Sequence, residues 1–372
     1  MLDTLLRELF DWTLATFEQP GNARKLQVAL IAIGGYGRAE LNPHSDIDIM
    51  LLHSGSMPSV NRIFSHPLLE KLTGAGGLIY TLYDLGLKVG HSVRNIQDAV
   101  NVANDDMQTK TSLIESRLIT GDAGLFGQFQ QRLEARCVRN HVGNYLQMRI
   151  GNQDARRVKF GNSALLQEPN IKNGCGGLRD YQNLLWMTHF KYGAHTLEQL
   201  EAQGMVRPRN RRQLEVGYDF LLRTRNELHL QTKRLADDIP KALQPKIAWQ
   251  LGYKDRSPAR RLEAFMRDLY THMRAIHLIT RMVERRLALR PKPARRLPSL
   301  RSFFGGGKKT ETLDGFNIID GELVPISPRI FKDQPRRLMR VFLHAQQRGL
   351  EFHPDLTQLL RDNVSLVDDD FV

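Results

Sequence analysis

Two acidic residues, Asp46 and Asp48, lie two positions apart in an apolar segment that has the composition of a β-strand. Because successive side chains of a strand alternate between its faces, both carboxylates are expected on one face, with Ile47, Ile49 and Leu51 packed on the other. Two neighbouring carboxylates repel each other unless a cation joins them. Mg²⁺ prefers oxygen ligands, and a nucleoside triphosphate can supply the ligands that the protein does not. The pair therefore predicts a divalent metal site for phosphoryl chemistry.

A glycine pair, Gly34-Gly35, ends the apolar segment that precedes these acids. Without side chains, the backbone N–H groups of such a turn can approach a phosphate chain closely. Ser45, directly before Asp46, can add a hydroxyl group. An acidic strand end beside a glycine turn also occurs by chance, but a glycine pair followed ten residues later by Ser-Asp-x-Asp is rarer. The combination favours nucleotidyl transfer, in which metal ions activate an oxygen and neutralise the departing pyrophosphate.

The composition is that of a soluble globular protein of two or three domains, with 372 residues, 41% hydrophobic and 25% charged. No run of about 18 apolar residues could cross a bilayer, and the N-terminus reads as an amphipathic helix, not as a secretion signal. Two cysteines, Cys137 and Cys175, cannot form a disulfide framework or a structural zinc site by themselves. We therefore expect a cytoplasmic protein without a membrane partner.

The chain is basic, with 53 Lys and Arg against 40 Asp and Glu and a formal net charge of +13. Such a charge attracts polyanions, whether nucleic acids, nucleotides or an acidic protein. Excess charge on solvated helices is the alternative interpretation.

Hydrophobic patterning predicts an α+β fold, with a small mixed sheet in a nucleotidyltransferase head and a large helical body. The expected strands are 27–33, 46–52 and 82–93, and a hairpin is expected across Asp320-Gly321. The expected helices are 1–19, 66–74, 111–119, 125–147, 178–192, 212–230, two within 259–289, 335–348 and a short one from 353. The expected domains are an N-terminal helix (1–22), the nucleotidyltransferase domain (23–125), a helical domain (126–286), a basic Pro/Gly-rich linker (287–312) and a hairpin with C-terminal helices (313–372).

The segment GGYGRAELNPHSDIDIMLL resembles the nucleotidyltransferase superfamily typified by DNA polymerase β, and within it the bacterial PII uridylyltransferases of nitrogen regulation. Three further segments are similar to that narrower family: DLGLKVGHSVRNIQDA, TSLIESRLITGD and EPNIKNGCGGLRDYQNLLW. A weaker similarity lies in LGYKDRSPARRLEAFMRDLYTHMRAI, and together these segments cover nearly the whole chain up to about residue 350.

The resemblance implies roles for particular residues. Asp46 and Asp48 would be catalytic carboxylates that bind Mg²⁺, with Mn²⁺ as an alternative ion. Gly34, Gly35 and Ser45 would hold the triphosphate, and Arg38 could reach a phosphate.

Members of the superfamily usually carry a third carboxylate on a later strand. Asp84, expected to open the third strand, and Glu115 are both candidates, and spacing does not decide between them. For either residue the alternative is an ion pair with Arg94 or Arg117.

A second glycine pair precedes the helix expected at 178–192, with Lys172 nearby and Arg179 and Asp180 on its first turn. These three residues could contact the triphosphate or a protein substrate. The alternative is a tight packing turn between head and body, with Arg179 in an internal salt bridge.

The leading functional hypothesis is transfer of UMP from UTP to a tyrosine of a PII-type signalling protein, with Mg²⁺ and release of pyrophosphate. The alternatives are an RNA or tRNA nucleotidyltransferase and a nucleotide-binding scaffold with little turnover. Full-length members of the family continue with a hydrolase domain built on a His-Asp dyad and with amino-acid-sensing domains, and this sequence contains no His-Asp dipeptide. We therefore expect either a fragment or a short relative that lacks these domains.

Overall fold

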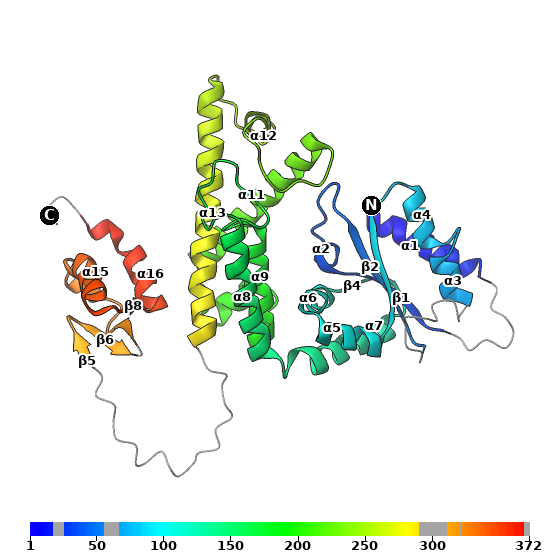
Figure 1. Cartoon of the computed structure of the whole chain (residues 1–372), viewed down its shortest axis with the longest axis horizontal. Helices are drawn as coiled ribbons and strands as arrows, with labels where there is room; N and C mark the ends of the chain where they lie inside the picture. Colours follow the sequence, from blue (N-terminus) through cyan, green and yellow to red (C-terminus); the bar gives the residue numbers. More distant parts are fainter. Residues whose placement is uncertain (18–25, 56–66, 290–310, 320, 368–372) are drawn as a thin grey trace, which may run out of the picture. The chain divides into compact units, whose positions relative to one another are not determined.

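The computed structural model describes residues 1–17, 26–55, 67–289, 311–319 and 321–367 (Figure 1). The chain divides into two compact units, residues 1–280 and residues 281–372. Most of the predicted linker, 290–310, lies outside the described residues, as do the predicted break at 20–22 and the tail from 368.

A four-stranded mixed sheet forms the head of the first unit. Its strands are β1 (Val28–Ala32), β2 (Ile47–His53), β3 (Val89–Asn95) and β4 (Arg117–Gly121), in the order β3-β2-β1-β4. Strand β1 is antiparallel to both β2 and β4, whereas β2 and β3 are parallel. This arrangement confirms the predicted small mixed sheet.

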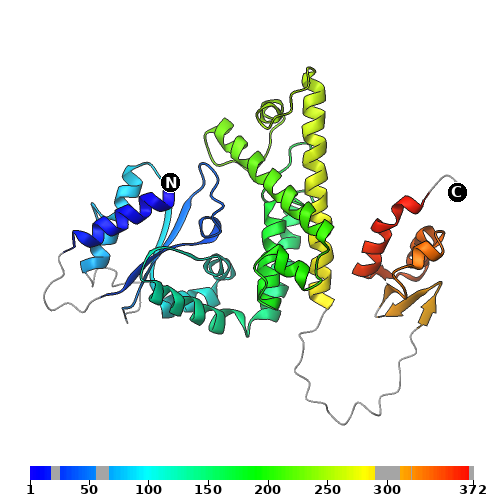
Figure 2. The same ribbon diagram turned by 180° about the vertical axis from the view of Figure 1, so that it is seen from behind.

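Helices cover both faces of this sheet (Figures 1 and 2). One face carries α1 (Leu2–Ala15), α3 (Pro67–Thr73) and α4 (Leu78–Asp84), and the other carries α5 (Ile96–Asp105) and α7 (Ala123–Leu133).

The two faces have separate hydrophobic cores. Ile47, Ile49 and Leu51 belong to the core beneath α1, whereas Met50 and Leu52 belong to the core beneath α5 and α7. The alternation expected along this strand is therefore confirmed, and it leaves the Asp48 side chain on the face of Met50.

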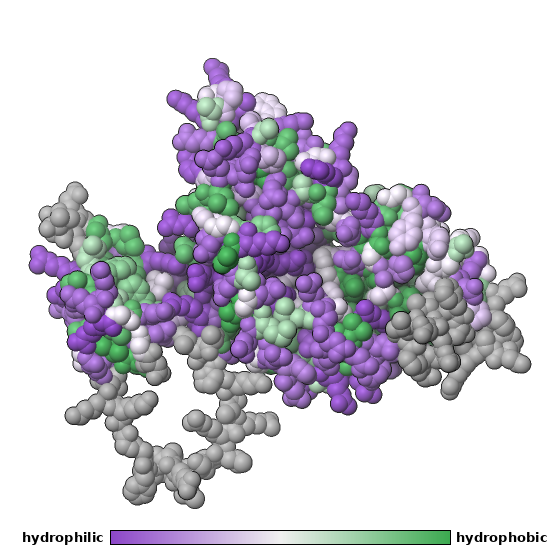
Figure 3. All heavy atoms as spheres, in the orientation of Figure 1, coloured by the Kyte–Doolittle hydropathy of each residue, from purple (hydrophilic) through white to green (hydrophobic). Residues whose placement is uncertain are grey.

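The helical body of the first unit follows the head, and its face in Figure 3 is largely hydrophilic. Its elements are a π-helical segment (Glu134–Val138), α8 (Val142–Lys159), α9 (Leu178–Tyr192), α10 (Leu197–Ala202), α11 (Pro208–Thr232), α12 (Gln244–Gln250) and α13 (Pro258–Leu289). Helix α9 coincides with its predicted range. The predicted α+β class with a large helical body is confirmed.

Four predicted elements were wrong in extent or type. The expected strand 82–93 begins as the end of α4, because Leu78, Ile79 and Leu82 bury one helical stripe and Gly86, at φ +73°, follows the helix end. The range 111–119 contains the end of α6 (Met107–Ile114) and the start of β4.

The other two differences concern helix continuity. The range 125–147 is divided among α7, the π-helical segment and α8, and 259–289 is one helix of 32 residues where two were expected. An apolar 3–4 spacing persists through such breaks, so it does not locate them.

The second unit has its own sheet and core. Its strands β5 (Glu311–Leu313), β6 (Phe316–Ile319), β7 (Glu322–Pro325) and β8 (Glu351–Phe352) lie in that order, and β6 and β7 form the predicted hairpin. The helices are α14 (Ile330–Asp333), α15 (Arg337–Arg348) and α16 (Pro354–Asp362), of which the last two were predicted. Across the described ranges of both units, no helix combines the length and apolar character that a bilayer crossing requires.

Candidate active site

A cavity of about 670 Å³ brings together residues of the head and of the helical body. The head contributes the turn after β1, the start of β2 and part of α6, and the body contributes α8, α9, α11 and the loop before α9. Nine of the eleven residues proposed from the sequence line this cavity: Gly34, Gly35, Arg38, Ser45, Asp46, Asp48, Glu115, Lys172 and Arg179. Asp84 and Asp180 do not.

The two aspartates lie at the start of β2. Asp46 directly precedes the strand and is exposed, whereas Asp48 is its second residue and is half-buried. Burial raises the pKa of the Asp48 carboxyl, the charge of Asp46 raises it further, and Lys172 opposes both effects. The two carboxylates therefore interact unfavourably, which is the condition that a bound cation relieves.

The glycine turn lies beside Asp48. Gly34 opens the short helix α2 (Gly34–Gly37) with φ +57°, a conformation that favours glycine. A Cβ atom at this position would lie 3.8 Å from Asp48 Oδ2. The Oγ atom of Ser45 is buried and has no hydrogen-bond partner in the described part of the chain, so it is available to a ligand.

Gly90 is a site residue that the sequence reasoning missed. It is paired with Asp48 in the register of β2 and β3, and a Cβ atom there would lie only 2.5 Å from Asp48 Oδ1. Any larger residue would displace the carboxylate. The signal in the sequence was a glycine inside a predicted strand, which often marks a close approach.

The donor set fits a divalent ion that takes most of its ligands from a nucleotide. Among the residues with described positions, no group of three or more His, Cys, Asp or Glu side chains could hold a metal ion. The chain would therefore supply the carboxylates of Asp46 and Asp48, while phosphate oxygens and water complete the shell. Mg²⁺ is commonly bound in this way.

Neither candidate for a third carboxylate is free beside this pair. Glu115 lines the cavity, but its Oε2 accepts a hydrogen bond of 2.6 Å from Arg38, and its Oε1 accepts one from Trp186 Nε1. Asp84 is exposed at the end of α4. The expectation that Asp84 opens the third strand was wrong, because β3 begins at Val89.

Arg38 is held by two acids. Its Nε donates to Glu40 at 2.7 Å, in addition to its bond with Glu115. Although burial opposes it, the charges of Glu115 and Glu40 raise the pKa of the guanidinium. Arg38 is thus a fixed cation at the edge of the cavity.

Arg179 and Lys172 form a basic wall of the cavity that belongs to the body, whereas the aspartates belong to the head. The Arg179 guanidinium lies over the Trp186 ring, 5.1 Å from its centre, and burial together with the charges of Arg38 and Arg149 lowers its pKa to about 10. No ion pair of Arg179 occurs within the described ranges, so the alternative of an internal salt bridge at Arg179 is not seen. A largely buried guanidinium with no direct ion pair can bind an anionic ligand strongly.

Lys172 is nearly as buried as Arg179. Burial lowers the pKa of its ammonium group, and its Nζ lies 3.8 Å from Asp237 Oδ2. The charge of Lys172 also lowers the pKa of Asp48.

Asp180 has a packing role. It is fully buried, contacts the guanidinium groups of Arg156 and Arg157, and accepts a hydrogen bond from the Gly176 N–H at 2.8 Å. Burial opposes ionisation, but His277 and the two arginines lower the pKa of Asp180. The packing-turn alternative therefore describes Asp180, while Lys172 and Arg179 face the cavity.

Several other lining residues were not proposed from the sequence. They are Arg149 and Arg156 on α8, Trp186 on α9, Arg225 on α11 and Asp106 at the start of α6. Asp106 caps α6 by accepting a hydrogen bond of 2.6 Å from the Thr109 N–H. The arginines carry no local motif, because only tertiary packing brings α8 and α11 to the cavity.

Residues 144–284 match the family model described as GlnD PII-uridylyltransferase. The chain is 30% identical over 370 residues to the bifunctional uridylyltransferase/uridylyl-removing enzyme of Azospirillum brasilense, which covers 99% of this chain and 38% of that protein. The enzyme of the same description from Rhodospirillum rubrum is 30% identical over 369 residues, with the same two coverages. The chain thus spans about 38% of the length of these curated relatives. Residues 144–284 therefore form a GlnD PII-uridylyltransferase family domain, and the chain is homologous to these curated relatives over 99% of its own length.

Proposed function

We propose that this chain transfers UMP from UTP to a protein hydroxyl group, with Mg²⁺ bound by Asp46 and Asp48. The observation that carries the proposal is the placement of this acidic pair beside a glycine turn in the same cavity as the cations Lys172 and Arg179. A triphosphate with its metal ion complements both walls, because its phosphates are anionic and its ion is cationic.

Each residue has a distinct part in this proposal. The Gly34 turn and the Ser45 hydroxyl would bind the β- and γ-phosphates, and Lys172 with Arg179 would hold the triphosphate in line. The acceptor oxygen forms a bond to the α-phosphorus while the bond to the β-phosphate oxygen breaks, so pyrophosphate leaves and the hydroxyl proton passes to solvent. The bound ion would offset the charge of the triphosphate and lower the pKa of the attacking hydroxyl.

The acceptor that we propose is a tyrosine of a PII-type signalling protein. The support is the name of the matching family model and the uridylyltransferase activity in the names of the relatives. Those relatives are also named as uridylyl-removing enzymes, and we assign only the transfer to this chain.

The experiment is incubation of the chain with Mg²⁺, a purified PII-type protein and each α-³²P-labelled triphosphate in turn. We expect label from UTP to become covalent on the PII-type protein and to resist removal by competing unlabelled nucleotide. A control without Mg²⁺ and a control with Asp46→Asn should remain unlabelled. Label on added tRNA with none on protein would replace this function with RNA nucleotidyl transfer.

A second function is favoured by the engagement of Glu115 with Arg38 and Trp186, because neither of the two acids proposed as a third carboxylate is then free beside the acidic pair. In that case the chain binds UTP and Mg²⁺ as a regulatory scaffold. Isothermal titration that detects UTP binding, combined with no pyrophosphate release in the presence of acceptor, would support the scaffold against the transferase.

A further inference from the structure

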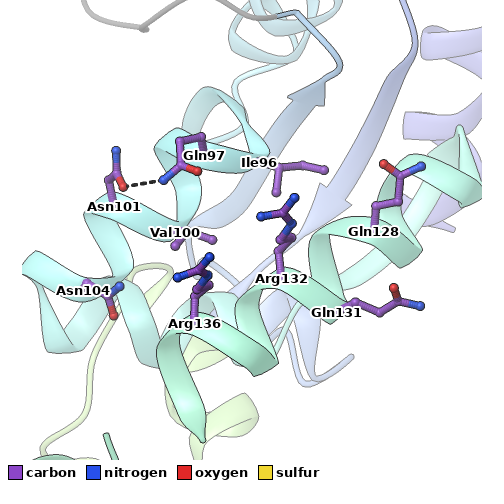
Figure 4. A pocket seen from close by; sticks show the side chains of 9 residues that line it. All are labelled: Ile96, Gln97, Val100, Asn101, Asn104, Gln128, Gln131, Arg132 and Arg136. Atoms are coloured by element: carbon purple, nitrogen blue, oxygen red, sulfur yellow. Dashed lines mark hydrogen bonds between the residues drawn. The ribbon is translucent and has the colours of Figure 1, made fainter. Parts of the chain in front are cut away.

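A second and larger cavity, of about 860 Å³, lies where the head meets the start of the helical body (Figure 4). Its walls are α5 on one side and α7 with the π-helical segment on the other. It shares no lining residue with the candidate active site. We call it the α5–α7 groove, and nothing in the proposed transfer of UMP uses it.

Two guanidinium groups project into this groove. Arg132 lies in the last turn of α7 and Arg136 in the π-helical segment, and Figure 4 shows both side chains between the two walls. Both residues are exposed, and neither has an ion pair or a side-chain hydrogen bond within the described ranges. No acidic residue lines the groove. Two like charges four residues apart repel each other, so an anionic ligand would relieve an existing strain.

The backbone between the two arginines is unusual. Residues Glu134–Val138 form a π-helix, in which the N–H of Arg139 donates to Glu134 O at 3.2 Å. A π-helical turn adds one residue and so changes the direction of the side chains that follow it. Such segments are rare and frequently occur at functional sites. Here the segment carries Arg136 on the wall of the groove.

Amide side chains make up most of the remaining lining. They are Gln97, Asn101, Asn104, Gln128 and Gln131. Gln97 donates to Asn101 at 2.8 Å, whereas no side-chain hydrogen bond joins the other three to any described residue. An amide offers both donors and an acceptor, the same combination that an extended peptide backbone presents.

The types of residue that line the groove also indicate the class of ligand. A nucleotide or single-stranded RNA is usually held by aromatic stacking, and no aromatic residue lines this groove. Its apolar contribution comes from Ile96 and Val100, which suit an aliphatic side chain. The volume exceeds that of a small anion, and an open polar groove between two helices has the form of a peptide site.

We propose that the α5–α7 groove binds an extended acidic peptide segment of a partner protein. Arg132 and Arg136 pair with its carboxylates, the amides bind its main chain, and Ile96 with Val100 contact an aliphatic side chain. The groove also lies near the candidate active site, because Asn104 lines one cavity and Asp106, two residues later at the turn between α5 and α6, lines the other. A segment bound here would tether its protein beside that site.

The test is fluorescence anisotropy with the full chain and a fluorescein-labelled hexapeptide of alternating glutamate and valine, without nucleotide. We expect saturable binding that weakens at least tenfold in the double variant Arg132→Gln/Arg136→Gln. The matched control is Arg209→Gln/Arg212→Gln, which removes the same charge from exposed positions on α11 and should change the affinity less than twofold. The same peptide with glutamine in place of glutamate should bind at least tenfold more weakly than the acidic one.

Further measurements distinguish a peptide site from a small-anion site and from an RNA site. The variant Asn104→Ala/Gln131→Ala, which keeps the charge, should also weaken peptide binding, because main-chain contacts are lost. Equal affinity of the wild type and the arginine variant would overturn the proposal, as would no binding to either. Displacement of the peptide by equimolar inorganic phosphate would show a small-anion site, and tighter, arginine-dependent binding of a labelled eight-nucleotide RNA would show an RNA site. Both results contradict a peptide groove.

Discussion

The Asp48 carboxylate is the clearest case of a residue whose environment opposes its own charge. It is half-buried on β2, it lies beside Asp46, and Lys172 compensates only in part. Because its pKa is raised in the folded protein, the ionised carboxylate costs stability once the pH exceeds the pKa of the unfolded state. A cation bound beside such a carboxylate would stabilise its ionised form, and perturbed carboxylates of this kind are frequent at functional sites.

Replacing Asp48 by Asn should separate activity from stability. We expect UMP transfer to fall at least about 1,000-fold, since several kcal/mol of metal-derived stabilisation are lost. Without metal, the free energy of unfolding of the variant at pH 7 should exceed that of the wild type by about 0.5–2 kcal/mol, because the unfavourable charge of Asp48 is gone. Urea denaturation measures the second effect. Asp219→Asn, at an exposed pair with Arg223, is the control that should change neither property.

The raised pKa of Asp48 also predicts how metal use depends on pH. As the pH falls toward this raised pKa, protons compete with Mg²⁺ for the carboxylate. The Mg²⁺ concentration needed for half-maximal transfer should therefore rise toward the acid end of the pH range in which the protein stays folded. A half-maximal concentration that stays constant across this range would contradict a direct role for Asp48 in binding the ion.

Gly90 tests the position of the same carboxylate without changing its charge. In Gly90→Ala the new methyl group would meet Asp48 Oδ1 at 2.5 Å, so the carboxylate must move. A shift of about 1 Å at a reacting site can cost about 100-fold in rate, and we expect a loss of that order in transfer. Gly127→Ala on α7, where an added Cβ meets nothing within 4 Å, should keep full activity. Similar rates for the two variants would argue against Asp48 as a site residue.

At the scale of elements, Asp180 joins three helices of the body. It belongs to α9, its arginine partners Arg156 and Arg157 belong to α8, and His277 of α13 lies 3.7 Å from its Oδ2. These contacts fix the loop before α9, which carries Lys172 toward the cavity. A buried acid among cations thus positions residues that face the nucleotide site.

Asp180→Asn should be strongly destabilising. It removes the buried carboxylate that Arg156 and Arg157 share, and removing one partner of a buried ion pair typically costs about 3–5 kcal/mol. The exposed Asp219→Asn control should cost less than about 1 kcal/mol. Thermal and urea unfolding of both variants check the comparison, and costs of equal size would show that the buried cluster does not hold the body together.

Local sequence signals located some elements well and others poorly. The β2 alternation and the stripe of α9 are strong periodic patterns, and both elements were predicted. Strand β4 was missed because its five residues follow a helix directly, and pairing with β1, not local pattern, makes it a strand. Sequence spacing likewise could not settle the role of Glu115, because its partner Trp186 is 71 residues away.

At the scale of the molecule, the site exists because the head and the helical body pack together. The loop before Asp46 is tied to α11 by a hydrogen bond of 2.6 Å from Asn42 to Asn226, and Tyr218 of α11 donates to Glu40 at 2.7 Å. Most of the acids in the cavity come from the head and most of the bases from the body. The sequence predicted the acidic pair because its motif is local, but the arginines of α8 and α11 could be found only in the assembled unit.

The most direct measurement is a crystal structure of the chain with Mn²⁺ and a non-hydrolysable UTP analogue, with anomalous data collected for the ion. We predict an anomalous peak in contact with carboxylate oxygens of both Asp46 and Asp48, and phosphate oxygens within hydrogen-bond distance of Lys172 and Arg179. A triphosphate bound elsewhere, or bound here with no ion between the two aspartates, would contradict this prediction.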